Sequence, residues 1–161
     1  MVEWSLIKLI VSDFDGVMTD NRVLIDEMGK ESVYVSRADG QGVNILKSLG
    51  IDLIIISTET NNVVERRALK LKVECIHGVA NKAECIATYC HERNISLKTV
   101  AYIGNDINDY EAMQLAGIKI VPSDAYEEVK SIADYVTEAK GGYGVVREVA
   151  GAIKNAMDSQ K

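Results

Sequence analysis

Proline is nearly absent from this chain of 161 residues, which has one, Pro122, and no tract rich in proline, serine or glutamine. Such tracts are typical of linkers and disordered regions. A length of 161 residues also falls within the usual range of one domain. We therefore expect a single folded domain over residues 1–161.

Long apolar runs and an excess of basic residues are also missing. No stretch approaches the roughly 20 apolar residues of a membrane-spanning helix, and residues 1–4 show no basic segment of a secretory signal. The chain has 18 Lys and Arg against 24 Asp and Glu, a net charge of −6, which opposes binding to nucleic acid phosphates. We expect a cytoplasmic protein with no membrane or nucleic acid partner.

Cysteine and histidine are too few and too scattered for a disulfide framework or a zinc site. Cys75, Cys85 and Cys90 are odd in number and form no pair at metal-binding spacing. We expect reduced, partly buried thiols without an assigned role. His77 and His91 are isolated and also receive none.

Apolar periodicity predicts alternating strands and helices. Four short apolar segments have the composition of strands buried on both faces of a parallel sheet: residues 6–12, 53–57, 99–103 and 118–121. Four others have helical spacing: residues 43–49, 63–71, 83–90 and 110–116. Gly50 and Gly117 follow two of these, where a left-handed helix stop costs little. The class is α/β, with a mostly parallel sheet and helices on both faces.

Two segments depart from this alternation. Residues 22–25 and 31–36 are short and β-prone, and the turn-forming residues 26–29 lie between them, which predicts a projecting β-hairpin over about residues 22–36. Residues 140–144 form a glycine-rich bend before a last helix, and together they make a tail over about residues 140–161.

The first apolar strand ends in an acidic cluster that contains Asp13, Asp15 and Gly16. Ligands of open α/β sheets bind beyond the carboxyl ends of the strands. A turn at Gly16 can bring Asp15 back toward Asp13, and two such carboxylates call for a hard cation, above all magnesium. One carboxylate can attack phosphorus while the other serves as acid and base. An aspartate-rich turn can also simply cap a strand, so this cluster alone leaves both interpretations open.

Residues 13–20 (Asp-Phe-Asp-Gly-Val-Met-Thr-Asp) resemble the first motif of the haloacid dehalogenase superfamily phosphatases. The resemblance implies that Asp13 is the nucleophile and Asp15 the acid and base. It continues in order along the chain, because Ser57 matches the residue that hydrogen-bonds the phosphoryl group and Lys82 the lysine that offsets its charge.

The loop 104–109 matches the family's acidic metal loop but has Asn105 where an aspartate is usual, followed by Asp106. The resemblance implies a magnesium ion held by Asp13, Asp15 and Asn105. Asp106 is the alternative third ligand, and Asp109 would orient the ligands.

The likeness extends over about residues 6–148 and implies a three-layer Rossmann-like fold without a cap domain. The hairpin, residues 37–40 and residues 141–148 resemble the capless phosphatases of 3-deoxy-2-ulosonic acid phosphates. Members of that group are tetramers whose neighbouring subunits help to close the site, so the likeness implies a homotetramer. Arg147 in the tail is a candidate contact for an anion.

The group divides by substrate at the residues after Ser57. Octulosonate 8-phosphate (KDO 8-phosphate) phosphatases have Gly-Arg there, whereas this chain has Thr58 and Glu59. The nonulosonate (sialic acid or KDN) 9-phosphate phosphatases have a glutamate at the position of Glu59. Basic residues of the latter match Arg67 and Lys70. This implies that a nonulosonate 9-phosphate is favoured, although a solvated helix face would equally explain Arg67 and Lys70.

The function we expect is magnesium-dependent hydrolysis of a small sugar-acid phosphate through an aspartyl-phosphate on Asp13. The main alternative is an inactive assembly module like those attached to acylneuraminate cytidylyltransferases, and Asn105 is the reason to consider it. Against that alternative stand Asp13, Asp15, Ser57 and Lys82, since an idle site has no physical need for two carboxylates that repel each other.

Overall fold

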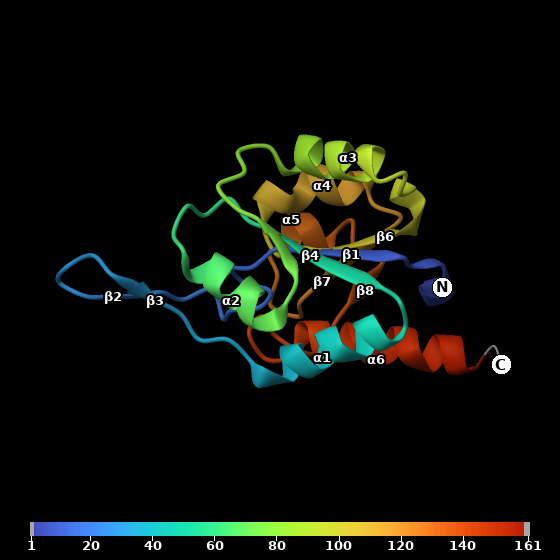
Figure 1. Ribbon diagram of the computed structural model, residues 1–161, viewed down its shortest axis with the longest axis horizontal. Helices are drawn as coiled ribbons and strands as arrows, with labels where there is room; N and C mark the ends of the chain where they lie inside the picture. The colour runs from blue at the N-terminus through green and yellow to red at the C-terminus, as the bar shows by residue number, and fades with distance from the viewer. Residues whose placement is uncertain (1, 160–161) are drawn as a thin grey trace.

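The computed structural model describes residues 2–159 as a twisted sheet between two layers of helices (Figure 1). Six strands pair in the order β5-β4-β1-β6-β7-β8, and every pair is parallel. The strands are β1 (Leu9–Ser12), β4 (Asp52–Ile56), β5 (Glu74–Ile76), β6 (Val100–Ile103), β7 (Ile118–Val121) and β8 (Tyr135–Val136). The predicted α/β class with a parallel sheet is confirmed.

One helical layer is made of α1 (Arg37–Ser48), α2 (Val63–Leu71) and α6 (Val145–Asp158). The other, on the opposite face in Figure 1, is made of α3 (Lys82–Glu92), α4 (Tyr110–Leu115) and the short α5 (Glu127–Lys130). A short 3₁₀ helix, η1 (Trp4–Leu6), precedes β1, and two more lie in connections: η2 (Leu97–Thr99) and η3 (Ile107–Asp109). Within residues 2–159, no helix is long and apolar enough to cross a membrane.

The sequence of β1 is apolar at successive positions because both faces of this strand are buried. Ile10 packs with α1, α2 and α6 on one face of the sheet, whereas Leu9 and Val11 pack with α3 and α4 on the other. Both faces of a central parallel strand are buried, so the alternation of apolar and polar residues disappears. This packing fixes the carboxyl end of β1 in the middle of the sheet.

A two-stranded hairpin extends away from the rest of the molecule (Figure 1). It consists of β2 (Leu24–Ile25) and β3 (Glu31–Ser32), paired antiparallel. Asp26 holds its turn, because its Oδ1 accepts hydrogen bonds from the backbone N–H of Met28 at 2.9 Å and of Lys30 at 2.8 Å. The predicted hairpin is confirmed, and several of its apolar side chains lie in solvent.

Some predicted details are wrong. The first strand begins at Leu9 rather than at residue 6, because residues 4–6 form η1. Gly50 has the predicted left-handed backbone (φ 72°), whereas Gly117 does not. A Cβ at Gly117 would lie 2.6 Å from the carbonyl carbon of Lys98, so glycine is needed there for close packing. The three thiols are free, as predicted.

Candidate active site

The carboxyl ends of the neighbouring strands β4, β1 and β6 bring three polar residues together. Asp13 follows β1, Ser57 follows β4, and Asn105 lies two residues after β6. Ladder hydrogen bonds continue one residue past the strands: Asp13 N–H donates to the Ile103 carbonyl at 2.9 Å, and Ser57 N–H to the Ile76 carbonyl at 3.0 Å. The backbone of Asp13 and of Ser57 is therefore held in place by the neighbouring strand.

Gly16 makes the turn that carries Asp15. Its φ of 85° lies in the left-handed region, which glycine adopts at little cost. Thr19 Oγ1 accepts a hydrogen bond from Gly16 N–H at 3.1 Å and donates one to Asp15 Oδ1 at 3.4 Å. A Cβ at Gly16 would overlap the Asn105 amide. The glycine therefore permits both the turn and the close approach of the metal loop.

Lys82 lies between two buried carboxylates. Its Nζ is 2.9 Å from Asp13 Oδ1 and 2.7 Å from Asp109 Oδ1. Lys82 begins α3, whose N-terminus is capped by Asn81, because the Asn81 side chain accepts a hydrogen bond from Glu84 N–H at 3.0 Å. Burial alone would lower the pKa of Lys82, but the two carboxylates raise it above its usual value. The ammonium group therefore stays charged beside Asp13.

Asp109 is 0 % exposed and accepts three hydrogen bonds. Lys82 and the Tyr102 hydroxyl (2.8 Å) donate to Oδ1, and Asn105 N–H donates to Oδ2 at 3.0 Å. A Cβ at Gly104 would lie 2.6 Å from Asp109 Cβ, so only glycine allows this approach. The sequence prediction missed Tyr102. A tyrosine in a strand buried on both faces was a usable signal, because its hydroxyl needs a partner there.

One end of the Asn105 amide lies 3.0 Å from the Asp15 backbone carbonyl oxygen and 3.1 Å from Asp13 Oδ2. If that end is the nitrogen, it donates hydrogen bonds to both oxygens. If it is the oxygen, three oxygen donors lie close together, and oxygen ligands are those that a hard divalent cation such as magnesium prefers. The residues present therefore fit a magnesium ion, with Asp15 contributing its backbone carbonyl.

Asp106, the alternative ligand, has a different role in the structure. Its Oδ1 accepts a hydrogen bond from Ile107 N–H at 2.7 Å and so caps η3. In the described part of the chain, no three His, Cys, Asp or Glu side chains gather as metal ligands. Amide and backbone oxygens are outside these four kinds of side chain. The site beside Asp13 would instead use the Asn105 amide and the Asp15 backbone carbonyl as its other ligands.

The two aspartates of the first motif have raised pKa values. For Asp13 the causes are burial and the Asp109 carboxylate, which outweigh Lys82. For Asp15 the causes are burial, followed by the Glu59 carboxylate, while Thr19 acts in the opposite direction. A raised pKa favours the protonated form of Asp15, which a general acid requires.

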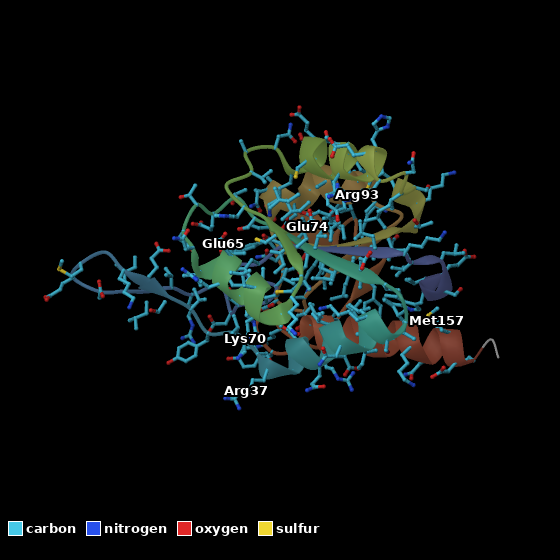
Figure 2. All side chains as sticks on the ribbon, in the orientation of Figure 1. Arg37, Glu65, Lys70, Glu74, Arg93 and Met157 are labelled. Carbon is cyan, nitrogen blue, oxygen red and sulfur yellow. The ribbon has the colours of Figure 1, made fainter. Side chains whose placement is uncertain are left out.

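The predicted substrate residues do not come together within one chain. Glu59 is exposed and lines a pocket of about 710 Å³. Arg67 is half-buried, and its Nη2 donates to the Ser36 carbonyl at 2.9 Å. Lys70 is exposed in the last turn of α2, where Figure 2 labels it. Arg147 is exposed in the first turn of α6.

The fold and the site together define a class of protein: parallel α/β proteins with an aspartate, a lysine and an oxygen donor set arranged for phosphoryl transfer. A family model for haloacid dehalogenase-like hydrolases matches residues 58–149. The 3-deoxy-D-manno-octulosonate 8-phosphate phosphatase of Yersinia pestis is 34% identical over an alignment of 156 residues that covers 94% of this chain and 82% of that protein.

Solved structures agree with this. The 3-deoxy-D-manno-octulosonate 8-phosphate phosphatase of Moraxella catarrhalis, in complex with magnesium, phosphate and KDO, is 34% identical with a TM-score of 0.91, over 95% of this chain and 88% of that one. A protein of Streptomyces avermitilis, provisionally named as a HAD family hydrolase, is 42% identical with a TM-score of 0.88, over 90% of this chain and 83% of that one. The chain therefore belongs to the haloacid dehalogenase-like hydrolases, a family of enzymes, and the resemblance found in the sequence is confirmed.

Proposed function

We propose that this protein is a magnesium-dependent phosphatase that hydrolyses a 3-deoxy-2-ulosonic acid phosphate through an aspartyl-phosphate on Asp13. The observation that carries the proposal is the buried cluster in which Lys82 and Asn105 flank Asp13, with Asp15 at the adjacent turn. The relatives are named as octulosonate 8-phosphate phosphatases, and one of their structures holds magnesium and phosphate.

In the first step, an oxygen of Asp13 forms a bond to phosphorus while the bond from phosphorus to the sugar oxygen breaks. The proton on Asp15 moves to the departing sugar oxygen, and its raised pKa makes that proton available. In the second step, Asp15 takes a proton from water as the water oxygen bonds to phosphorus, and the bond to Asp13 breaks.

Lys82 and Ser57 support both steps. The Lys82 ammonium, 2.9 Å from Asp13 Oδ1, offsets negative charge on the phosphoryl oxygens, and the Ser57 hydroxyl donates to them. When bound by Asp13, the Asp15 carbonyl and Asn105, magnesium would screen the phosphate from the attacking carboxylate. We propose Asn105 rather than Asp106 as the third ligand, because the Asp106 carboxylate caps η3.

Two substrates remain candidates. The names of the relatives favour octulosonate 8-phosphate, whereas Glu59, which lines the pocket beside Ser57, is our reason to test nonulosonate 9-phosphate as well. The comparisons lend no support to that second preference or to the inactive assembly module.

We also propose that residues 1–161 act as one cytoplasmic catalytic domain that assembles as a homotetramer. The hairpin supports self-association, since it exposes large apolar side chains such as Leu24 (69 % exposed) and Met28 (86 % exposed). Exposed apolar patches of this kind mark interaction surfaces. Light scattering of the wild type and of Leu24→Asp tests it: a tetramer that the substitution dissociates is expected, and a monomeric wild type would contradict it.

The function is tested by phosphate release from octulosonate 8-phosphate and nonulosonate 9-phosphate, with magnesium or with chelator, for the wild type and Asp13→Asn. We expect magnesium-dependent release from at least one ester and its loss in the variant. The faster ester identifies the substrate. If neither ester releases phosphate at high magnesium, the proposal is wrong and the inactive module becomes the leading account.

A further inference from the structure

A pocket of about 710 Å³ lies between the hairpin and the N-terminal end of α2. Residues 29–33 line it on the hairpin side, and residues 59–63 with Arg66 line it on the other. Its wall begins two residues after Ser57 in the chain, where Glu59 N–H donates to Ser57 Oγ at 3.2 Å. Glu59 therefore links the pocket to the strand end that carries Ser57.

Asn61 joins two carboxylates across the pocket. Its Nδ2 lies 3.0 Å from Glu31 Oε2 and 3.3 Å from Glu59 Oε2. Its Oδ1 accepts a hydrogen bond from Val63 N–H at 3.1 Å, which fixes the orientation of the amide. Glu31 comes from the hairpin and Glu59 from the loop after β4, so one side chain gathers two like charges from separate parts of the chain.

Both carboxylates retain acceptor capacity. Across residues 2–159, the side chains of Glu31 and Glu59 hydrogen-bond only to Asn61, and neither they nor Arg66 form an ion pair. An ionised carboxylate can accept about four hydrogen bonds. Glu59 and Glu31 also contribute to the raised pKa of Asp15, so their charges act on the catalytic acid.

The charges in the pocket define what it can hold. Two adjacent carboxylates repel an anionic group and favour hydroxyl donors. Of the two cations that line the pocket, Lys30 and Arg66, the planar guanidinium of Arg66 can bind a carboxylate through two parallel hydrogen bonds. A ligand with hydroxyls near one end of the pocket and an acid group near the other satisfies both.

We propose that this pocket binds the part of a phosphorylated sugar acid beyond its phosphate, with Glu31 and Glu59 accepting hydrogen bonds from hydroxyls and Arg66 binding the carboxylate. The inference rests on the proposed function and adds Glu31, Asn61 and Arg66 to its substrate contacts. Within one chain, Arg66 takes the role that the sequence suggested for Arg67, whose guanidinium is bonded to the Ser36 carbonyl.

The test compares kcat/KM for the hydrolysis of three substrates in the presence of magnesium. Octulosonate 8-phosphate has hydroxyls and a carboxylate, arabinose 5-phosphate has hydroxyls only, and 4-nitrophenyl phosphate has neither. Loss of a hydrogen bond to a charged group lowers kcat/KM by about 10- to 100-fold. We expect Glu31→Gln to show that loss on both sugar phosphates, and Arg66→Met to show it on the sugar acid alone. Arg66→Met should match the wild type on 4-nitrophenyl phosphate, and Glu31→Gln should lose much less there than on the sugar phosphates, because its charge acts on Asp15 as well.

Two exposed residues provide matched controls, Glu27→Gln in the hairpin turn and Lys98→Met in η2. Both should leave all three values unchanged. Equal losses of Arg66→Met on all three substrates, no loss on any, or an equal loss in Lys98→Met would overturn the inference. If the wild type hydrolyses neither octulosonate 8-phosphate nor nonulosonate 9-phosphate with magnesium, the proposed function itself fails, which is a distinct result.

Discussion

Replacing Tyr102 by phenylalanine tests the buried network behind the nucleophile. The Tyr102 hydroxyl donates to Asp109 Oδ1 at 2.8 Å, and both residues are 0 % exposed. The substitution removes only the hydroxyl, so the apolar packing of the ring in β6 stays. Asp109 keeps its bonds to Lys82 and to Asn105 N–H. The change is therefore the loss of one hydrogen bond to a buried carboxylate, about 1.5–3 kcal/mol.

The assay is urea denaturation at pH 7 in the presence of chelator, with thermal unfolding as a second measurement. For a chain of this size, about 1 kcal/mol lowers Tm by about 2–4 °C, so we expect a fall of about 3–12 °C. The matched control is Tyr126→Phe, because Tyr126 is 54 % exposed and its hydroxyl has no partner among residues 2–159. That control should stay within about 0.5 kcal/mol of the wild type.

Activity provides a second readout of the same variant. With one donor lost, Asp109 attracts Lys82 more strongly and draws it from Asp13. We expect kcat/KM to fall by about tenfold, less than the 100-fold or more that loss of a direct donor costs. A loss of stability below about 0.5 kcal/mol in Tyr102→Phe would refute the view that this hydroxyl holds Asp109.

Three further predictions concern Asp39, a buried residue in the first turn of α1, Asn105 in the metal loop, and Gly141 beside the first motif. Burial raises the pKa of Asp39 from 3.8 to about 6, so the contribution of Asp39 to stability is complete below about pH 4 and is lost as the pH rises through 6. In urea denaturation, the wild type should therefore lose up to about 3 kcal/mol between pH 4 and 8 relative to Asp39→Asn. A difference between the two proteins that stays constant with pH would contradict this. Asn105→Asp should bind magnesium on the order of tenfold more tightly in activity titrations, since a carboxylate is a stronger ligand than an amide, and unchanged affinity would rule Asn105 out as a ligand. A Cβ at Gly141 would overlap the Gly16 carbonyl, so Gly141→Ala should destabilise the protein by about 1–3 kcal/mol and lower kcat, whereas Gly40→Ala, with its nearest neighbour at 3.6 Å, should do neither.

The sequence was sufficient for the main elements of the fold because each of them is long enough to show a pattern. The apolar composition of β1 and the helical spacing of α2 are both visible in the chain alone. The strands β5 and β8, three and two residues long, are below the length at which periodicity can be recognised. They form because β4 and β7 offer open edges, which is a property of the assembled sheet.

The sequence also indicated which residues meet at the edge of the sheet. Asp13 and Ser57 follow strands whose carboxyl ends must lie together, so their proximity follows from the topology. The orientation of Arg66 and Arg67 did not follow in the same way. Adjacent helical residues point about 100° apart, and which one borders the pocket depends on where the hairpin lies. The contact of Asn61 with Glu31, 30 residues away, had no local signal.

The most direct test of the mechanism is a rapid-mixing experiment on Asp15→Asn with 4-nitrophenyl phosphate and magnesium. This leaving group needs no protonation, so attack by Asp13 can proceed while hydrolysis of the aspartyl-phosphate is slowed. We predict a burst of about one equivalent of nitrophenol per site, with one phosphoryl group mapped to Asp13 by mass spectrometry and none in Asp13→Asn. Linear release without a burst, or a phosphoryl group at another residue, would contradict the assignment of Asp13 as the nucleophile.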